Sequence, residues 1–141
     1  MAQTGQCLCG SVKLSISAEP IVWRMCWCTD CQAFAAGSAT YNAMFPADAI
    51  QTDGIVHWFQ SKADSGNLMS RGFCPNCGTP IFTKGAARPD VCGVRVGVLP
   101  EMREIKPQAV IWTDSAPGWV AHDPQIPHFP GSPPAPPTLD R

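Results

Sequence analysis

The sequence predicts a mainly β fold made of short, mostly antiparallel strands. Three observations support this prediction. In residues 11–17 the apolar side chains Val12, Leu14 and Ile16 alternate with polar ones, which is the period of a strand with one buried face. The chain contains fifteen prolines and twelve glycines, which disfavours long helices. Its eight cysteines fall mostly in short, turn-like motifs between the expected strands.

Further strands are expected where β-branched and aromatic residues gather between turn signals. These strands are residues 38–45, 55–60, 72–74, 81–83, 91–99 and 109–113. Helical signals are limited to short turns. One covers residues 29–35, with Thr29 or Asp30 as its N-cap, and another follows Pro100.

The length and charge of the chain limit its organisation and its partners. Its 141 residues are the length of about one domain. We expect one domain over residues 1–129 and a proline-rich, extended tail over residues 130–141. The net charge of −1 disfavours a nucleic-acid binder. The sequence shows neither a long apolar run nor a signal peptide, so we expect a cytoplasmic protein that does not bind membranes.

Seven of the cysteines form three motifs with metal-ligand spacing. These motifs are Cys7-Leu8-Cys9-Gly10, Cys26-Trp27-Cys28-Thr29-Asp30-Cys31 and Cys74-Pro75-Asn76-Cys77-Gly78. A tetrahedral zinc site needs thiolates about 3.7 Å apart, because each Zn–S bond is ~2.3 Å long. A one- or two-residue gap allows this spacing, and a glycine after the pair supports the turn by accepting a positive φ. The coincidence of three motifs favours zinc.

The seven thiols divide into a set of four and a set of three. The pairs Cys7/Cys9 and Cys74/Cys77 can close one four-thiolate site, which would be structural because it has no open position. The triplet Cys26, Cys28 and Cys31 supplies three ligands and leaves a fourth position free, as in catalytic zinc sites. The expected cofactor is therefore zinc, two ions per chain.

Other uses of these cysteines stay open from the sequence alone. Disulfides are disfavoured because cysteines one residue apart pair badly and no export signal is seen. Cys28 and Cys31 alone would suit a redox pair, and four thiolates would suit an iron–sulfur cluster. Cys92 lies in an apolar strand pattern and is expected to be a buried apolar residue, although it is also the alternative fourth ligand of the triplet.

The charge of a three-thiolate zinc site indicates its chemistry. Zinc with three thiolates carries a formal charge of −1, so it should acidify a bound water poorly. It is better suited to a soft sulfur ligand, whose thiol pKa it lowers. The implied reaction makes or breaks a bond at the sulfur of a substrate.

At these residues the chain resembles the glutathione-dependent formaldehyde-activating enzyme family, which includes centromere protein V-like proteins. The matching segments are residues 5–12, 26–31 and 71–80, with a weaker match over residues 111–119. Two positions depart from the usual family pattern C-H-C-x-x-C-R, because Trp27 stands for the histidine and Gln32 for the arginine. Cations that complement an anionic thiol must then come from Arg24, Arg71, Arg88, Arg95 or Arg103.

The resemblance implies a zinc-bearing β-tent fold with a structural zinc on Cys7, Cys9, Cys74 and Cys77 and a catalytic zinc on Cys26, Cys28 and Cys31. It implies a carbon–sulfur lyase-type enzyme like S-(hydroxymethyl)glutathione synthase, which joins formaldehyde to a glutathione-like small thiol. The alternative is a non-catalytic, zinc-stabilised binding or scaffold module. For substrate binding the candidates are Trp27, which lies between two expected ligands, and Arg71, which either binds a carboxylate or positions the cysteine turn. The histidines are isolated: His57 lies in a strand pattern and is expected to be structural or exposed, and His122 and His128 lie in the proline-rich end. A general base or the fourth ligand of the triplet is the alternative role for any of the three.

Overall fold

The structure is a computed structural model that describes residues 3–133. Over these residues it contains ten β-strands, one short α-helix and four 3₁₀ turns, which confirms the mainly β prediction. The described part of the expected tail is residues 130–133, and the rest of that tail lies outside the described residues.

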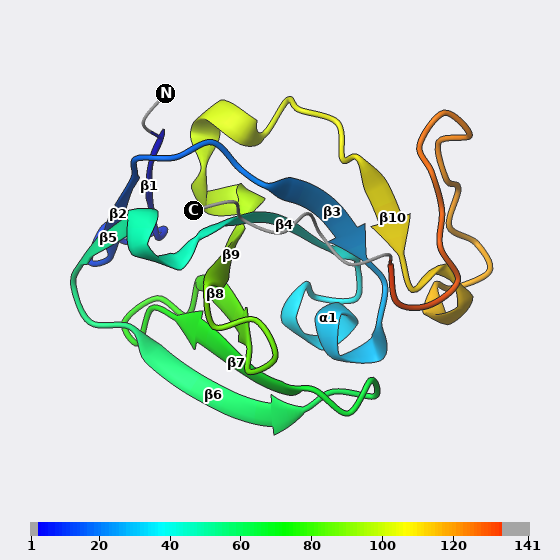
Figure 1. Ribbon diagram of the computed structural model, residues 1–141, viewed down its shortest axis with the longest axis horizontal. Coiled ribbons are helices and arrows are strands. Elements are labelled where there is room, and N and C mark those ends of the chain that lie inside the picture. Colours follow the sequence, from blue (N-terminus) through cyan, green and yellow to red (C-terminus); the bar gives the residue numbers. More distant parts are fainter. Residues whose placement is uncertain (1–2, 134–141) are drawn as a thin grey trace.

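Three strands form a small antiparallel sheet. They are β1 (Gln3–Gln6), β2 (Lys13–Ile16) and β5 (Ile50–Asp53), in the order β1-β2-β5. The alternation in β2 buries Leu14 and Ile16, as the sequence predicts. Figure 1 shows this sheet at one end of the molecule, on the side where the chain begins.

Seven strands form the larger sheet, in the order β10-β3-β4-β9-β8-β7-β6. Their bounds are β3 (Val22–Cys26), β4 (Thr40–Pro46), β6 (His57–Lys62), β7 (Leu68–Phe73), β8 (Pro80–Gly85), β9 (Val91–Arg95) and β10 (Ala109–Ile111). Every neighbouring pair is antiparallel except β10 and β3, which run parallel.

The helix α1 (Thr29–Phe34) lies between β4 and β7 (Figure 1). The 3₁₀ turns are η1 (Ala47–Ala49), η2 (Val96–Val98), η3 (Pro100–Met102) and η4 (Thr113–Ser115). After η4 the chain returns along β10, where Phe129 N donates to Val110 O at 2.9 Å. No helix in the described residues is long and apolar enough to span a membrane.

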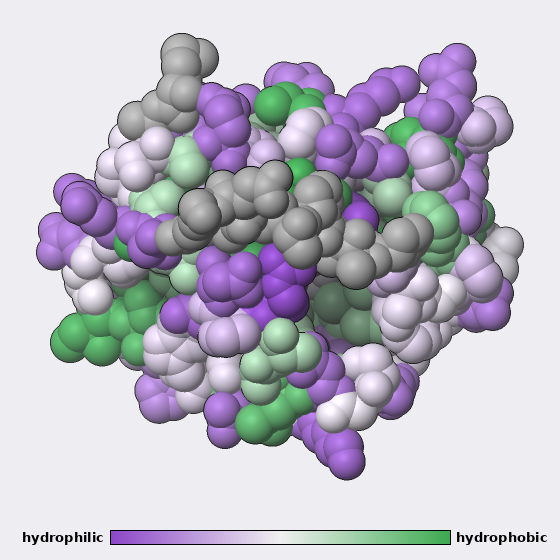
Figure 2. Space-filling view, in the orientation of Figure 1, coloured by the Kyte–Doolittle hydropathy of each residue, from purple (hydrophilic) through white to green (hydrophobic). Residues whose placement is uncertain are grey.

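The apolar core is continuous between the two sheets. It includes Val12, Leu14 and Ile16 from the small sheet and Phe45, Ile81 and Val94 from the large one. Cys7 and Cys74 belong to the same cluster of buried residues, so one cysteine motif is anchored directly in the core. On the face in Figure 2, hydrophobic residues are scattered among hydrophilic ones.

The structure corrects several predicted boundaries. The expected strand 91–99 ends at Arg95, because η2 turns the chain away through a hydrogen bond from Leu99 N to Val96 O at 2.9 Å. Strands β1, β3 and β5 were not predicted, since their sequences lack clear alternation or β-branched runs. The N-cap of α1 is Cys28, rather than Thr29 or Asp30.

Candidate metal centres

The first cluster brings together Cys7, Cys9, Cys74 and Cys77, whose ligand atoms all lie within 4.8 Å of one another. The Sγ atom of Cys9 is 3.6 Å from that of Cys7 and 3.8 Å from that of Cys74. These separations match the edge of a tetrahedron of sulfurs at ~2.3 Å from a central ion, which is the bond length of zinc thiolates. The four sulfurs therefore fit a metal site, although the two pairs are 65 residues apart in the chain.

Two glycine turns shape this cluster. Gly10 N donates to Cys7 O at 3.1 Å, and Gly78 N donates to Cys74 O at 2.8 Å. Both glycines have a positive φ, +79° and +75°, which favours glycine over any residue with a Cβ. Leu8 N joins the two turns by donating to Thr79 Oγ1 at 3.1 Å. The motifs predicted from the sequence are thus preformed as a pair of facing turns.

Polar neighbours favour the thiolate form of Cys9 and Cys77 in this cluster, whereas the pKa of Cys74 is raised to about 11, with burial among the causes. Contacts with Ser11, and with Asn76 whose side-chain amide donates to Cys9 Sγ at 3.2 Å, lower the pKa of Cys9 to about 7. Hydrogen bonds from the side chain and backbone of Thr79 lower the pKa of Cys77 to about 5. Metal ligands must be deprotonated, so these neighbours suit cation binding.

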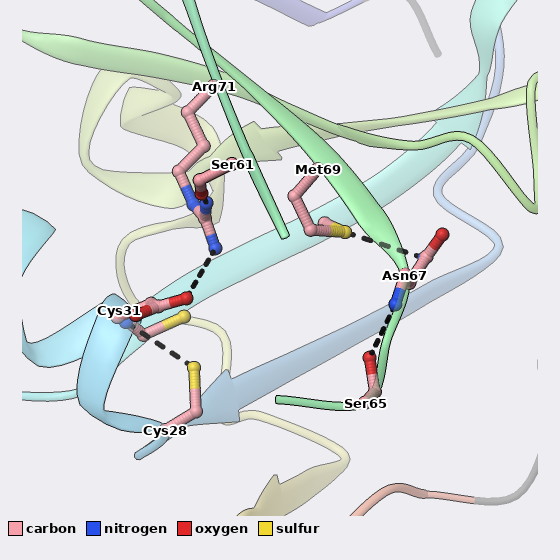
Figure 3. Close-up of polar contacts among 8 residues, drawn as sticks. Cys28, Cys31, Ser61, Ser65, Asn67, Met69 and Arg71 are labelled. Carbon is pink, nitrogen blue, oxygen red and sulfur yellow. Dashed lines mark hydrogen bonds and ion pairs between the residues drawn. The ribbon is translucent and has the colours of Figure 1, made fainter. Parts of the chain in front are cut away.

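The second cluster consists of Cys26, at the end of β3, and Cys28 and Cys31, at the start of α1. Their sulfurs also lie within 4.8 Å of one another. Cys28 caps the helix, because its Sγ accepts a hydrogen bond from Cys31 N at 3.3 Å, a contact drawn in Figure 3. The helix start and the metal-ligand geometry are therefore set by the same residue.

Gln32, which stands where the family pattern has an arginine, has a structural role here. Its Nε2 donates to Trp27 O at 2.8 Å and to Ser115 O at 2.9 Å. These bonds tie α1 to the turn η4. Neither bond brings a positive charge to this position, because both join the neutral Gln32 amide to backbone oxygens.

The three thiols of this cluster have strongly different proton affinities. Hydrogen bonds from Cys26 and Cys28 lower the pKa of Cys31, with smaller contributions from Thr40 and from the positive charge of Arg95. The same contacts, together with burial, raise the pKa of Cys26. The thiolate form in the triplet is therefore favoured at Cys31 over Cys26.

In the described residues the second cluster has three ligands. Cys92 is buried at 2% exposure among core residues, as predicted, and belongs to neither cluster. Its Sγ donates to Gly93 O at 3.6 Å, and burial raises its pKa to about 11. No histidine in residues 3–133 joins either cysteine group. The triplet therefore keeps the arrangement of three protein ligands.

Arg71 extends from β7 toward α1 beside the second cluster (Figure 3). Its side chain is buried, donates to Ser61 Oγ at 2.9 Å and forms an ion pair with Asp30 at 3.8 Å. Its guanidinium also lies 4.9 Å from the ring centre of Phe34. Asp30 therefore pairs with an arginine, where the sequence suggested a helix cap.

Trp27 is 5% exposed and packs edge-on against His122, with ring centres 6.4 Å apart. His122 in turn lies 4.9 Å from His128. Both histidines lie in the segment that returns after η4, and His122 is the one that packs against Trp27. A direct contact of Trp27 with substrate stays a prediction.

Arg95, one of the five arginines that the sequence offers as cations, is the one whose place at the site was not predicted. It is only 7% exposed, and its Nη1 donates to Asn42 Oδ1 at 2.6 Å. Its Nε is buried without a hydrogen-bond partner in the described residues. A signal was present in the sequence, because Arg95 is the lone charge in the apolar run from Val91 to Leu99.

Comparison with known proteins agrees with this arrangement. Residues 2–115 match the family model described as glutathione-dependent formaldehyde-activating enzyme. The chain belongs to this family. A crystal structure of a Rhodobacter sphaeroides protein from structural genomics is similar in fold, with a TM-score of 0.56 and 21% identity over 74% of this chain and 91% of that one. A search of curated proteins found no match.

Membership in the formaldehyde-activating enzyme family suggests a glutathione-related activity on formaldehyde. The two cysteine clusters are both inside the matched region, and both can hold a metal ion. The family thus suggests glutathione-related formaldehyde activation on a fold whose cysteine clusters could hold metal ions.

Proposed function

We propose that the protein is a zinc-dependent, carbon–sulfur lyase-type enzyme that acts on the adduct of a small thiol, as S-(hydroxymethyl)glutathione synthase does. Cys7, Cys9, Cys74 and Cys77 hold a structural zinc, and the triplet Cys26, Cys28 and Cys31 holds a catalytic one. The fourth position of the triplet is taken by the thiol of a glutathione-like substrate.

One observation carries this proposal, namely the contrast between the two clusters. The first has four sulfurs, enough to complete a tetrahedral metal site, whereas the second has three in the described residues. Three protein ligands and an open position are the usual arrangement of catalytic zinc. Two buried arginines, Arg71 and Arg95, lie close to the triplet and add positive charge where an anionic substrate would bind.

In the synthetic direction the thiol sulfur forms a bond to the formaldehyde carbon. The carbonyl π bond breaks, and the proton released by the thiol ends on the oxygen, which gives a hydroxymethyl thioether. Zinc supplies a lowered thiol pKa. The chain itself supplies the three thiolates that would hold the zinc, and Arg71 and Trp27 are its proposed contacts with the rest of the substrate.

Cobalt substitution tests the open position directly. The cobalt-loaded protein should show a thiolate-to-metal band that changes saturably when glutathione is added. The variant Cys28→Ser should lose that change, while Leu8→Ser, an 87% exposed neighbour of the first cluster, should keep it. A spectrum that no small thiol alters, with two cobalt ions bound, would instead support the non-catalytic scaffold module.

A further inference from the structure

Two cavities adjoin beside the second cluster, between α1 and the turn that leads into β8. One has a volume of about 340 Å³ and the other about 280 Å³, and they share Phe34, Pro80 and Arg95 in their walls. Arg71 lines the larger cavity. None of the seven clustered cysteines lines either cavity, so this space lies next to the metal centres without being part of them.

Arg95 carries a buried charge that no carboxylate in the described residues balances. Its Nη1 donates to the neutral amide oxygen of Asn42, and the groups that attract its charge are the sulfurs of Cys31 and Cys26. Its Nε has no hydrogen-bond partner in the described residues. Arg71 differs, since Asp30 and Ser61 already engage its guanidinium. A buried guanidinium N–H that lacks an acceptor is costly, so a carboxylate oxygen from outside the fold would be bound favourably here.

We propose that the larger cavity binds a carboxylate of the thiol substrate, with Arg95 as its anchor. This inference rests on the proposed function, because it places the carboxylate of a thiol whose sulfur lies at the triplet. The charge of Arg95 acts on Cys31, so the anchor and the metal-binding sulfurs are neighbours. A thiol that carries a carboxylate would therefore reach both, whereas a neutral thiol would reach only the metal.

The lining of the cavity favours a carboxylate over a phosphate. Phe34, Phe73, Pro80 and Phe82 give it mostly apolar walls, which suit an aliphatic chain. A phosphate near neutral pH carries up to two charges and would need more donors than one available guanidinium. A planar carboxylate matches the edge of an arginine and adds a single charge.

Nuclear magnetic resonance of the arginine Nε–H groups tests the anchor without any thiol. In the zinc-loaded protein the Arg95 signal, assigned by its loss in Arg95→Lys, should shift saturably with sodium propionate. The signal of Arg88, a partly exposed arginine that pairs with Asp90, serves as the internal control and should follow no saturation curve. An unmoved Arg95 signal, or tighter binding of inorganic phosphate than of propionate, would overturn the proposal.

A second variant neutralises the positive charge of Arg95 and leaves its guanidinium in place. Asn42→Asp would put a carboxylate on Arg95, 2.6 Å from Nη1 in the present geometry, and should abolish propionate binding. Asn67→Asp makes the same charge change in the β6–β7 turn and should leave binding unchanged. Equal propionate binding in both variants would contradict the role of Arg95.

Two matched thiols, one with a carboxylate and one without, then test whether Arg95 and the metal bind the same molecule. In the cobalt protein, 3-mercaptopropionate should bind at least about tenfold more tightly than 3-mercapto-1-propanol, since one charged hydrogen bond is at stake. Asn42→Asp should remove that preference. If propionate binds at Arg95 while no thiol alters the cobalt spectrum, the proposed function fails and the carboxylate pocket stands. Equal affinity of the two thiols, each altering the spectrum, would overturn the pocket alone.

Discussion

The substitution Cys9→Ser tests whether a metal ion at the first cluster stabilises the fold by cross-linking it. Cys9 is exposed, and substitution of an exposed residue usually changes stability by less than about 0.5 kcal/mol. As a ligand, however, Cys9 helps to join two chain segments 65 residues apart. If the metal bridge is treated as a cross-link, closure of a loop of that length reduces the entropy of the unfolded chain by the equivalent of about 4 kcal/mol.

Urea unfolding of the zinc-loaded protein in the presence of a reductant and a weak chelator measures this loss. With a slope of about 2 kcal/mol/M, losing the cross-link should lower the urea midpoint by about 2 M. Leu8→Ser is the matched control, because Leu8 is the exposed neighbour and offers no ligand. If Cys9→Ser unfolds at the same urea concentration as Leu8→Ser, the first cluster does not cross-link the fold.

Three further predictions concern single positions. Burial raises the pKa of the Cys92 thiol from 9.0 to about 11. The contribution of this thiol to stability is therefore present below pH 9 and is lost as the pH rises toward 11. In urea titrations over that pH range, the wild type should lose about 3 kcal/mol more of its free energy of unfolding than Cys92→Ala. Gly78→Ala should cost about 1–3 kcal/mol in thermal unfolding because φ is +75°, whereas Gly97→Ala, with open space around it and no positive φ, should change little. Asp30→Asn should cost less than about 1 kcal/mol by the same assay, because its 3.8 Å pair with Arg71 is partly exposed; a larger loss would mean that this ion pair holds α1 in place.

The metal-ligand clusters were predictable from the sequence because local spacing determines most of their geometry. A glycine after each pair of the first cluster marks a turn with positive φ, and the structure has that turn at Gly10 and at Gly78. The count of four plus three cysteines also identified which pairs meet across the fold. The short helix was predictable too, although its cap is Cys28, a member of the second cysteine cluster.

The rest depended on tertiary contacts that a single sequence does not specify. Val96 to Val98 has strong strand propensity, yet the chain turns there after β9, so packing overrides propensity. Arg95 could be recognised as unusual in an apolar run, but only the fold shows that it lies beside Cys31 and lines a cavity. The same holds for Gln32, whose bond to Ser115 spans 83 residues.

The number of metal ions per chain, counted by native mass spectrometry, tests the two-centre arrangement most directly. Two zinc ions are expected on the freshly purified protein. The variant Cys28→Ser should keep the zinc of the first cluster and lose the other, while Cys92→Ala should keep both. A wild-type chain with one zinc, or a Cys28→Ser chain that still holds two tightly, would contradict a second centre built on Cys26, Cys28 and Cys31.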